Sequence, residues 1–364
     1  MYNQQQQVFC LSFAANMASQ KLGTQQELQD NLAKALQAFV TKQETTANIG
    51  NWNVVWGPCV WQNAEKHSRG ADNAMAVFQQ GTTYVVAVAG TNAISQYDWN
   101  VEDFDVTADK MVALPYSGTK KLKPAIAGGT NTGVQILLGM KDPAKGTSLQ
   151  AFLQGLVASK PTVIFTGHSL GGALAPTLAM FLFGQGAPFK TSQFAAVKVL
   201  PTAGPTPGNA DFATYFAEVF PPTNKSATTY QIWNQLIWNH YDVVPHAWNH
   251  ADLIALPTLY GQSIPDVVKL TGIAMARSAG GNYTRLPYWL RLEGKVTRTV
   301  TDFAEYMGEA YYQHIAAYQV LFGVTDVWPV KAPEIQPSDE AVAMMTAKLS
   351  LIAGQADAAD AAVA

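Results

Sequence analysis

The chain has 364 residues, of which 48% are hydrophobic and 13% are charged, and its formal net charge is −3. This composition supports a large buried core and excludes a wholly disordered chain, which would combine low hydrophobicity with high charge. The small negative charge and the lack of basic runs exclude a nucleic-acid-binding protein, which would carry a basic patch.

Cys10 and Cys59 are the two cysteines of the sequence. They are too few for a disulfide framework or a cysteine-rich metal site, and their number is compatible with one disulfide or with two thiols.

In chain order, residues 1–45 are predicted to be helical, because Leu28, Leu32, Leu36 and Phe39 recur at helical spacing. The runs 74–80 and 84–89 predict a hairpin, and a helix is expected over 148–158. Further apolar runs predict strands at 162–166, 194–200 and 230–238. Alternating strands and helices predict an α/β protein with a mostly parallel central sheet flanked by helices.

The segment 252–300 is expected to be irregular, and 302–322 is expected to be a helix rich in aromatic residues. A proline-rich bend then precedes Ser338, a plausible N-cap for a helix that ends before Gly354. We therefore expect one domain over 1–330 with its core at about 50–325, and a C-terminal helix with a disordered, alanine-rich tail over 331–364.

The longest charge-free stretch lies between Lys160 and Lys190 and is long enough to span a membrane, but its glycines and prolines divide it into shorter pieces. We interpret it as a buried strand, a tight turn and a buried helix. No positive charge precedes the apolar residues 8–18, so a Sec signal peptide is not predicted. A cytoplasmic location, another export route and a leader outside this sequence all stay open.

The sequence Gly167-His168-Ser169-Leu170-Gly171 has the G-x-S-x-G pattern of a nucleophile elbow. It follows an apolar run and precedes a helix-like segment, which is the strand–turn–helix setting that the elbow requires. The alternative is an ordinary glycine-rich turn with an unremarkable serine. Small residues on both sides of Ser169 would let the turn tighten and expose its hydroxyl.

A serine nucleophile needs a histidine as base and an acid that orients the histidine. His67 precedes the serine and is disfavoured by chain order, and His168 is not expected to face its neighbour's hydroxyl. Asp242 follows a predicted strand, and His246 and His314 are candidate bases. A metal site at Asp242, His246 and His250 would need helical spacing, against which Pro245 argues.

Five ordered segments make the chain resemble the class 3 lipases, the family of the filamentous-fungal triacylglycerol lipases. They are VVAVAGT (85–91) with Trp99 and Asp103, TGHSLGGA (166–173), TAGPTPGNADF (202–212), Asn239–Pro245 and His314–Tyr318. The resemblance implies an α/β-hydrolase fold with helical N- and C-terminal extensions and a lid. It implies Ser169 as nucleophile, Asp242 as orienting acid and His314 as general base. The oxyanion hole would be formed by Thr91 and by the backbone N–H of Leu170.

The chain departs from the family at three places. Ala89 stands where the family often has an arginine. The 204–209 loop is one residue shorter than in the family and lacks an arginine that is common there. Pro176 lies inside the predicted helix, where its ring would crowd Gly172 one turn earlier.

These features predict a serine hydrolase that cleaves acylglycerol esters through an acyl-enzyme and needs no cofactor. A phospholipase A1, a feruloyl esterase or a short-chain esterase would use the same residues, and a non-catalytic lipid-binding protein is a further alternative. The expected partner is a lipid or ester substrate, which could lie at a lipid–water interface, and the oligomeric state is left open. The family pattern places a lid near 93–108, with 252–300 as an alternative.

Overall fold

The computed structural model describes residues 1–19, 21–63, 70–90, 106–223, 230–261 and 266–330. Within these residues, seven strands form one sheet in the order β1-β2-β3-β6-β7-β8-β9. They are β1 (Asn53–Trp61), β2 (Asn73–Gln80), β3 (Thr83–Val88), β6 (Thr162–His168), β7 (Ala196–Thr202), β8 (Leu236–Asn239) and β9 (Trp289–Leu292). A second, two-stranded sheet consists of β4 (Val112–Ala113) and β5 (Ala125–Ile126).

The large sheet is antiparallel at one edge and parallel over the rest. The β1–β2 and β2–β3 pairs are antiparallel, whereas β3, β6, β7, β8 and β9 are parallel neighbours. The mostly parallel sheet and its flanking helices are the α/β-hydrolase fold expected from the sequence. Because ligands bind at the carboxyl ends of parallel strands, this edge is where a site is expected.

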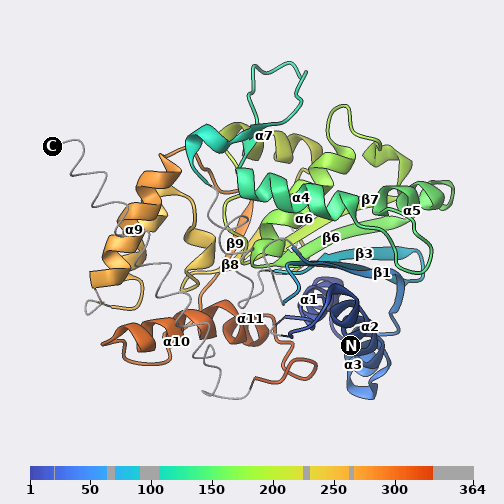
Figure 1. Cartoon of the computed structure of the whole chain (residues 1–364), viewed down its shortest axis with the longest axis horizontal. Helices are drawn as coiled ribbons and strands as arrows, with labels where there is room; N and C mark the ends of the chain where they lie inside the picture. Colours follow the sequence, from blue (N-terminus) through green and yellow to red (C-terminus); the bar gives the residue numbers. More distant parts are fainter. Residues whose placement is uncertain (20, 64–69, 91–105, 224–229, 262–265, 331–364) are drawn as a thin grey trace.

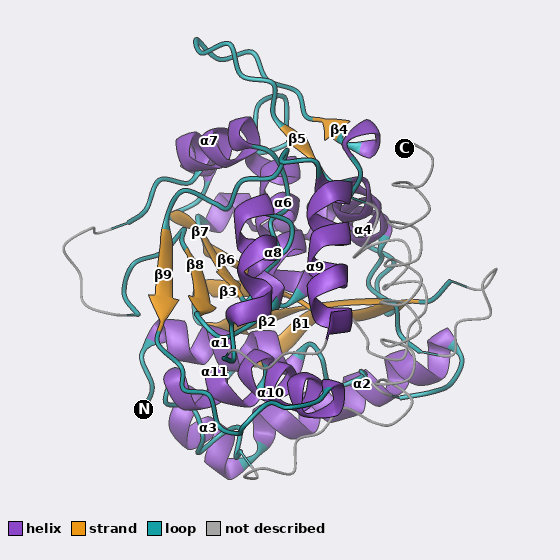
Figure 2. Ribbon diagram, turned by 90° about the vertical axis from the view of Figure 1, so that its left-hand side faces the viewer, coloured by secondary structure: helices purple, strands orange, loops and turns teal. Residues whose placement is uncertain are grey.

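Helices cover both faces of the sheet (Figure 1). They are α1 (Gln4–Ala14), α2 (Gln25–Thr41), α3 (Gln43–Ile49), α4 (Gly128–Gly139), α5 (Leu149–Leu156), α6 (Leu170–Phe183), α7 (Ala210–Val219), α8 (His250–Ala255), α9 (Asp266–Ala279), α10 (Phe303–His314) and α11 (Ala316–Leu321). In Figure 1, α1, α2 and α3 lie below the sheet and α4, α6 and α7 lie above it. Figure 2 shows the arrowheads of β8 and β9 directed toward the layer that contains α10 and α11.

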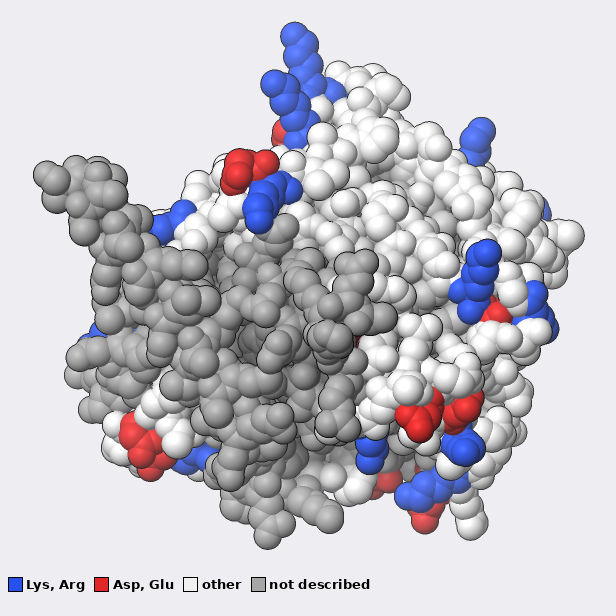
Figure 3. All heavy atoms as spheres, in the orientation of Figure 1, with Lys and Arg blue, Asp and Glu red and all other residues white. Residues whose placement is uncertain are grey.

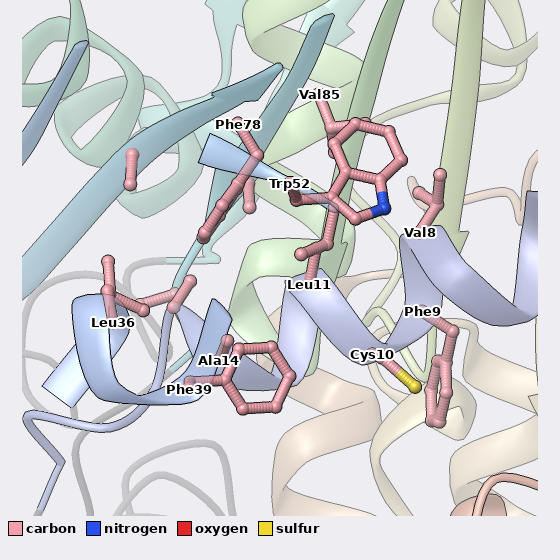
Figure 4. Close-up of a cluster of buried hydrophobic side chains, with 14 of the residues drawn as sticks. Val8, Phe9, Cys10, Leu11, Ala14, Leu36, Phe39, Trp52, Phe78 and Val85 are labelled. Atoms are coloured by element: carbon pink, nitrogen blue, oxygen red, sulfur yellow. The ribbon is translucent and has the colours of Figure 1, made fainter. Parts of the chain in front are cut away.

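The side chains of β3 alternate between two cores, as the period of a strand requires. Val85 and Ala87 join the core under α1 and α2, whereas Val86 and Val88 join the core under α4, α5, α6 and α7. Figure 4 shows the first core, where residues of α1 and α2 pack with Trp52 and the sheet. Burial of both faces explains why these strands are continuous apolar runs.

The helical N-terminal extension is present, and α2 shows why it forms. Thr24 caps the helix by accepting from the N–H of Glu27, whose carboxylate accepts from the N–H of Thr24 in return. The apolar positions Leu28, Leu32, Leu36 and Phe39 are all buried, as their spacing predicts.

Three sequence predictions are wrong in part. Of the predicted strand 230–238 only Leu236–Asn239 forms, because Tyr230 and Asn234 take positive φ values of 62° and 65° and turn the chain before it. The segment 252–300 is not simply irregular, since it contains α9, β9 and most of α8. The predicted helix 302–322 is divided into α10 and α11 at Ile315. The predicted C-terminal helix lies outside the described residues.

Charged side chains form small, separate groups on the face shown in Figure 3. Among the helices that the structure describes, none combines the length and the apolar character needed to cross a membrane.

Candidate active site

Ser169 occupies the sharp turn between β6 and α6. Its backbone has φ 62° and ψ −132°, a strained conformation that costs a non-glycine residue about 1–3 kcal/mol. A Cβ at position 167 would lie 2.2 Å from the carbonyl oxygen of Gly171, and one at position 171 would lie 2.5 Å from that of Val88. Only glycine fits at either position, so the pattern found in the sequence has a steric cause.

The structure brings the three residues of the predicted triad into one chain of hydrogen bonds. Nε2 of His314 lies 2.8 Å from Oγ of Ser169, and Nδ1 of His314 lies 2.9 Å from each carboxylate oxygen of Asp242. Asp242 follows β8 and is fully buried, and His314 is the last residue of α10. A neutral imidazole with its proton on Nδ1 donates to Asp242 and accepts from the serine hydroxyl.

Two further donors hold the carboxylate of Asp242. The N–H of Val244 donates to Oδ1 at 3.0 Å, and the hydroxyl of Tyr318 donates to Oδ2 at 2.8 Å. The Tyr318 oxygen also accepts from the N–H of Asn239 at 2.8 Å. Burial, followed by the negative charge of Asp242, raises the pKa of Tyr318 well above its ordinary value, so the hydroxyl keeps its proton. The sequence placed Tyr318 in a family segment but did not predict this contact.

The structure describes one of the two predicted oxyanion donors, Leu170. Leu170 begins α6, and the first N–H groups of a helix have no acceptor within the helix. Thr91 lies outside the described residues, as do Trp99 and Asp103.

Gly90, the residue before Thr91, is held against the elbow. Its N–H donates to Oδ1 of Asn16 at 2.7 Å, and the amide of Asn16 donates in turn to the carbonyl of Ser12 at 2.9 Å. A Cβ at position 90 would lie 2.9 Å from that of Ser169. Asn16 follows α1 and was missed by the sequence analysis, because nothing local marks a contact between residues so far apart in the chain.

The other histidine candidates take no part in this hydrogen-bond chain or lie outside the described residues. His246 is buried, with its Nε2 3.2 Å from the carbonyl of His240 in the same loop, and burial is the main cause that lowers its pKa. His67 lies outside the described residues. Val244–His246 form a single 3₁₀ turn, which does not provide the helical spacing that a metal site here would need. In the described parts of the chain, no three His, Cys, Asp or Glu side chains are grouped as a metal site.

The structure describes both cysteines and part of each lid candidate. Cys10 and Cys59 are buried thiols that are not joined to each other. The first lid candidate, 93–108, lies outside the described residues except for its end. In the second, α8 and α9 pack together through a small core that includes Leu253 and Ala276.

Comparison with known proteins shows that the chain is similar to lipases. The family model described as lipase (class 3) matches residues 85–251. The crystal structure of M37 lipase is 27% identical, with a TM-score of 0.72, and the match covers 90% of this chain and 96% of that one. A lipase from Rhizopus microsporus var. chinensis is 16% identical with a TM-score of 0.43, over 68% of this chain and 70% of that one. Lipase II from Rhizopus niveus has the same identity and TM-score, over 68% of this chain and 76% of that one. No curated protein matches the sequence.

The fold, the elbow and the family match define a lipase-type ester hydrolase of the α/β-hydrolase fold. The family match over residues 85–251 and the likeness to M37 lipase support assignment to the class 3 lipase family.

Proposed function

We propose that the protein hydrolyses acylglycerol esters through a Ser169–His314–Asp242 triad and an acyl-enzyme intermediate. The observation that supports this proposal most strongly is the continuous hydrogen-bond chain from Oγ of Ser169 through His314 to the buried carboxylate of Asp242. These side chains come from three distant parts of the sequence and meet at one hydroxyl.

In the first half-reaction, Oγ of Ser169 attacks the ester carbonyl carbon and its proton passes to Nε2 of His314. Asp242 stabilises the imidazolium that forms. His314 then gives the proton to the leaving alcohol, and the acyl group stays on the serine as an ester. Water attacks this ester with His314 as base again, which releases the carboxylic acid and restores the serine.

The tetrahedral intermediates carry negative charge on the former carbonyl oxygen. The N–H groups of Leu170 and Thr91 are the proposed donors to this oxygen, and the loss of one such donor costs about 3–4 kcal/mol in the transition state. The strained turn at Ser169 places its hydroxyl at the start of α6, where the helix dipole favours negative charge.

A substrate series tests the proposal. Hydrolysis rates are measured for p-nitrophenyl esters of increasing chain length, for emulsified and dissolved triacylglycerol, for a phosphatidylcholine and for a methyl ferulate, each with wild type and with Ser169→Ala. The proposal predicts that emulsified long-chain acylglycerol is the best substrate and that Ser169→Ala is inactive on all of them.

Preference for short dissolved esters, phosphatidylcholine or ferulate would instead identify the corresponding esterase with the same triad. Equal turnover by wild type and Ser169→Ala would contradict the serine mechanism itself.

A further inference from the structure

We propose that His168, the residue just before the nucleophile, is a positioning residue that fixes the main chain of His314 relative to Ser169. This inference rests on the proposed function, because it assigns His168 to the geometry of the same triad. Sequence reasoning rejected His168 as a base, and the structure supports a different use for it.

His168 joins the elbow directly to the base. Its Nε2 lies 2.7 Å from the carbonyl oxygen of His314, and the two residues are 146 positions apart in the chain. The centroids of the two imidazole rings are 4.9 Å apart. Because the backbone of His168 continues into Ser169, one side chain links the proposed nucleophile to the main chain of the proposed base.

The surrounding groups determine the tautomer of His168. A carbonyl oxygen can only accept, so Nε2 carries the proton and Nδ1 is bare. Oγ1 of Thr202 lies 3.1 Å from Nδ1 and 3.2 Å from the carbonyl oxygen of Gly167, so its one proton can go to either acceptor. Complete burial, followed by the charge of His314, lowers the pKa of His168 well below its ordinary value, so the ring stays neutral. A charged ring here would oppose the imidazolium that His314 forms during the reaction.

His168 binds the carbonyl of His314, which lies at the end of α10 and has no hydrogen-bond donor within that helix. His314 ends α10, and the chain bends at Ile315 before α11 begins. Carbonyls in the last turn of a helix lack partners within it, and a buried one needs a donor from elsewhere. The same bend brings Tyr318 of α11 to Asp242. His168 therefore stabilises the helix end that carries the base at the point where its direction changes.

Aromatic rings exclude water from this contact. The ring of Phe13 lies 4.7 Å from that of His168, and the ring of Tyr318 meets it edge-on at 4.9 Å. Only 3% of His168 is exposed. A hydrogen bond in such surroundings is stronger than one in water, so the contact can hold His314 in place. Phe13 belongs to α1, which lies outside the matched residues 85–251.

The test compares His168→Phe, which keeps a flat ring but removes the donor, with His168→Gln, which keeps an N–H donor at similar reach. Activity is expressed per active site titrated with a serine-directed phosphonate, so an unfolded fraction does not count. For His168→Phe we expect kcat to fall about 10- to 100-fold with KM nearly unchanged, since a displacement of ~1 Å at a reacting group costs up to about 100-fold. His168→Gln should recover to within about threefold of wild type.

Thr166→Val is the matched control. Thr166 is also fully buried on β6, and its hydroxyl donates to the carbonyl of Leu200 on β7 at 2.8 Å, away from His314. This variant should lose stability without losing kcat per titrated site. A value of kcat for His168→Phe close to wild type, or no recovery in His168→Gln, or an equal loss in Thr166→Val, would each overturn the inference.

If His168→Phe does not fold, Thr202→Val decides the question, because it removes the hydroxyl that lies beside Nδ1 of His168 and helps to hold the ring. We expect a loss of about 3- to 10-fold in kcat at constant KM, and an unchanged kcat would overturn the inference. Failure of the phosphonate to inactivate wild type would contradict the proposed function, whereas normal wild-type labelling with an active His168→Phe would contradict the role of His168 alone.

Discussion

Replacing Tyr318 by phenylalanine removes one oxygen atom from the most buried part of the site. The hydroxyl donates to Asp242 and accepts from the N–H of Asn239, both at 2.8 Å, and Tyr318 is fully buried. Loss of a hydrogen bond to a charged group costs about 1.5–3 kcal/mol, and a buried donor left without a partner costs about 1–3 kcal/mol. Because the two effects overlap, we expect Tyr318→Phe to lower the free energy of unfolding by about 2–4 kcal/mol.

Activity should fall as well, because the carboxylate that orients His314 loses one of its two fixed donors. We expect kcat to fall about 10-fold with little change in KM, as for other small displacements of a catalytic group. The assays are urea unfolding and steady-state ester hydrolysis.

Tyr230→Phe is the control for this variant, because its hydroxyl donates to the neutral carbonyl of Leu321 and not to a residue of the triad. It should cost about 1 kcal/mol and leave kcat unchanged. The reasoning is refuted if both variants lose the same free energy and neither changes kcat.

Three further predictions concern other residues of the site. His314→Ala should lower kcat by about 10⁴ to 10⁶, whereas His246→Ala should stay active, and the reverse result in an ester assay would move the base to His246. Asn16→Ala should weaken binding of a trifluoromethyl ketone, which forms an oxyanion, about 10-fold, because Gly90 loses its acceptor beside the elbow; unchanged inhibition would contradict this. The pKa of buried His168 is lowered, so below pH 6.5 the unfolded chain takes up a proton that the folded chain does not. The free energy of unfolding therefore decreases as the pH is lowered. Between pH 6.5 and 5.5 the loss is about 1 kcal/mol, and thermal unfolding of His168→Gln should show a correspondingly smaller decline.

The sheet was predictable where its strands are buried on both faces. The runs at 74–80, 84–89 and 162–166 are continuous and apolar, and each became a strand close to its predicted bounds. The run at 230–238 has a similar composition, but composition does not show that Tyr230 and Asn234 adopt positive φ. β9 was missed because it is only four residues long and Arg291 interrupts its apolar residues.

The residues of the site were also predictable from the sequence only in part. Ser169, Asp242 and His314 were named from the sequence because each lies in a recognisable segment in the expected order. Asn16 and the contacts of His168 could not be named, because they depend on how α1, β6 and the end of α10 pack together. Such contacts leave no spacing pattern in the sequence, since Asn16 and Gly90 are 74 positions apart and His168 and His314 are 146 positions apart.

The most direct test of the central claim is to treat the protein with a serine-directed alkyl phosphonate and to locate the adduct by peptide mass spectrometry. The account predicts one phosphonyl group per active chain, carried by Ser169, with activity lost in proportion to labelling and no labelling of His314→Ala on the same time scale. An adduct on another residue, or full activity after Ser169 is labelled, would contradict it.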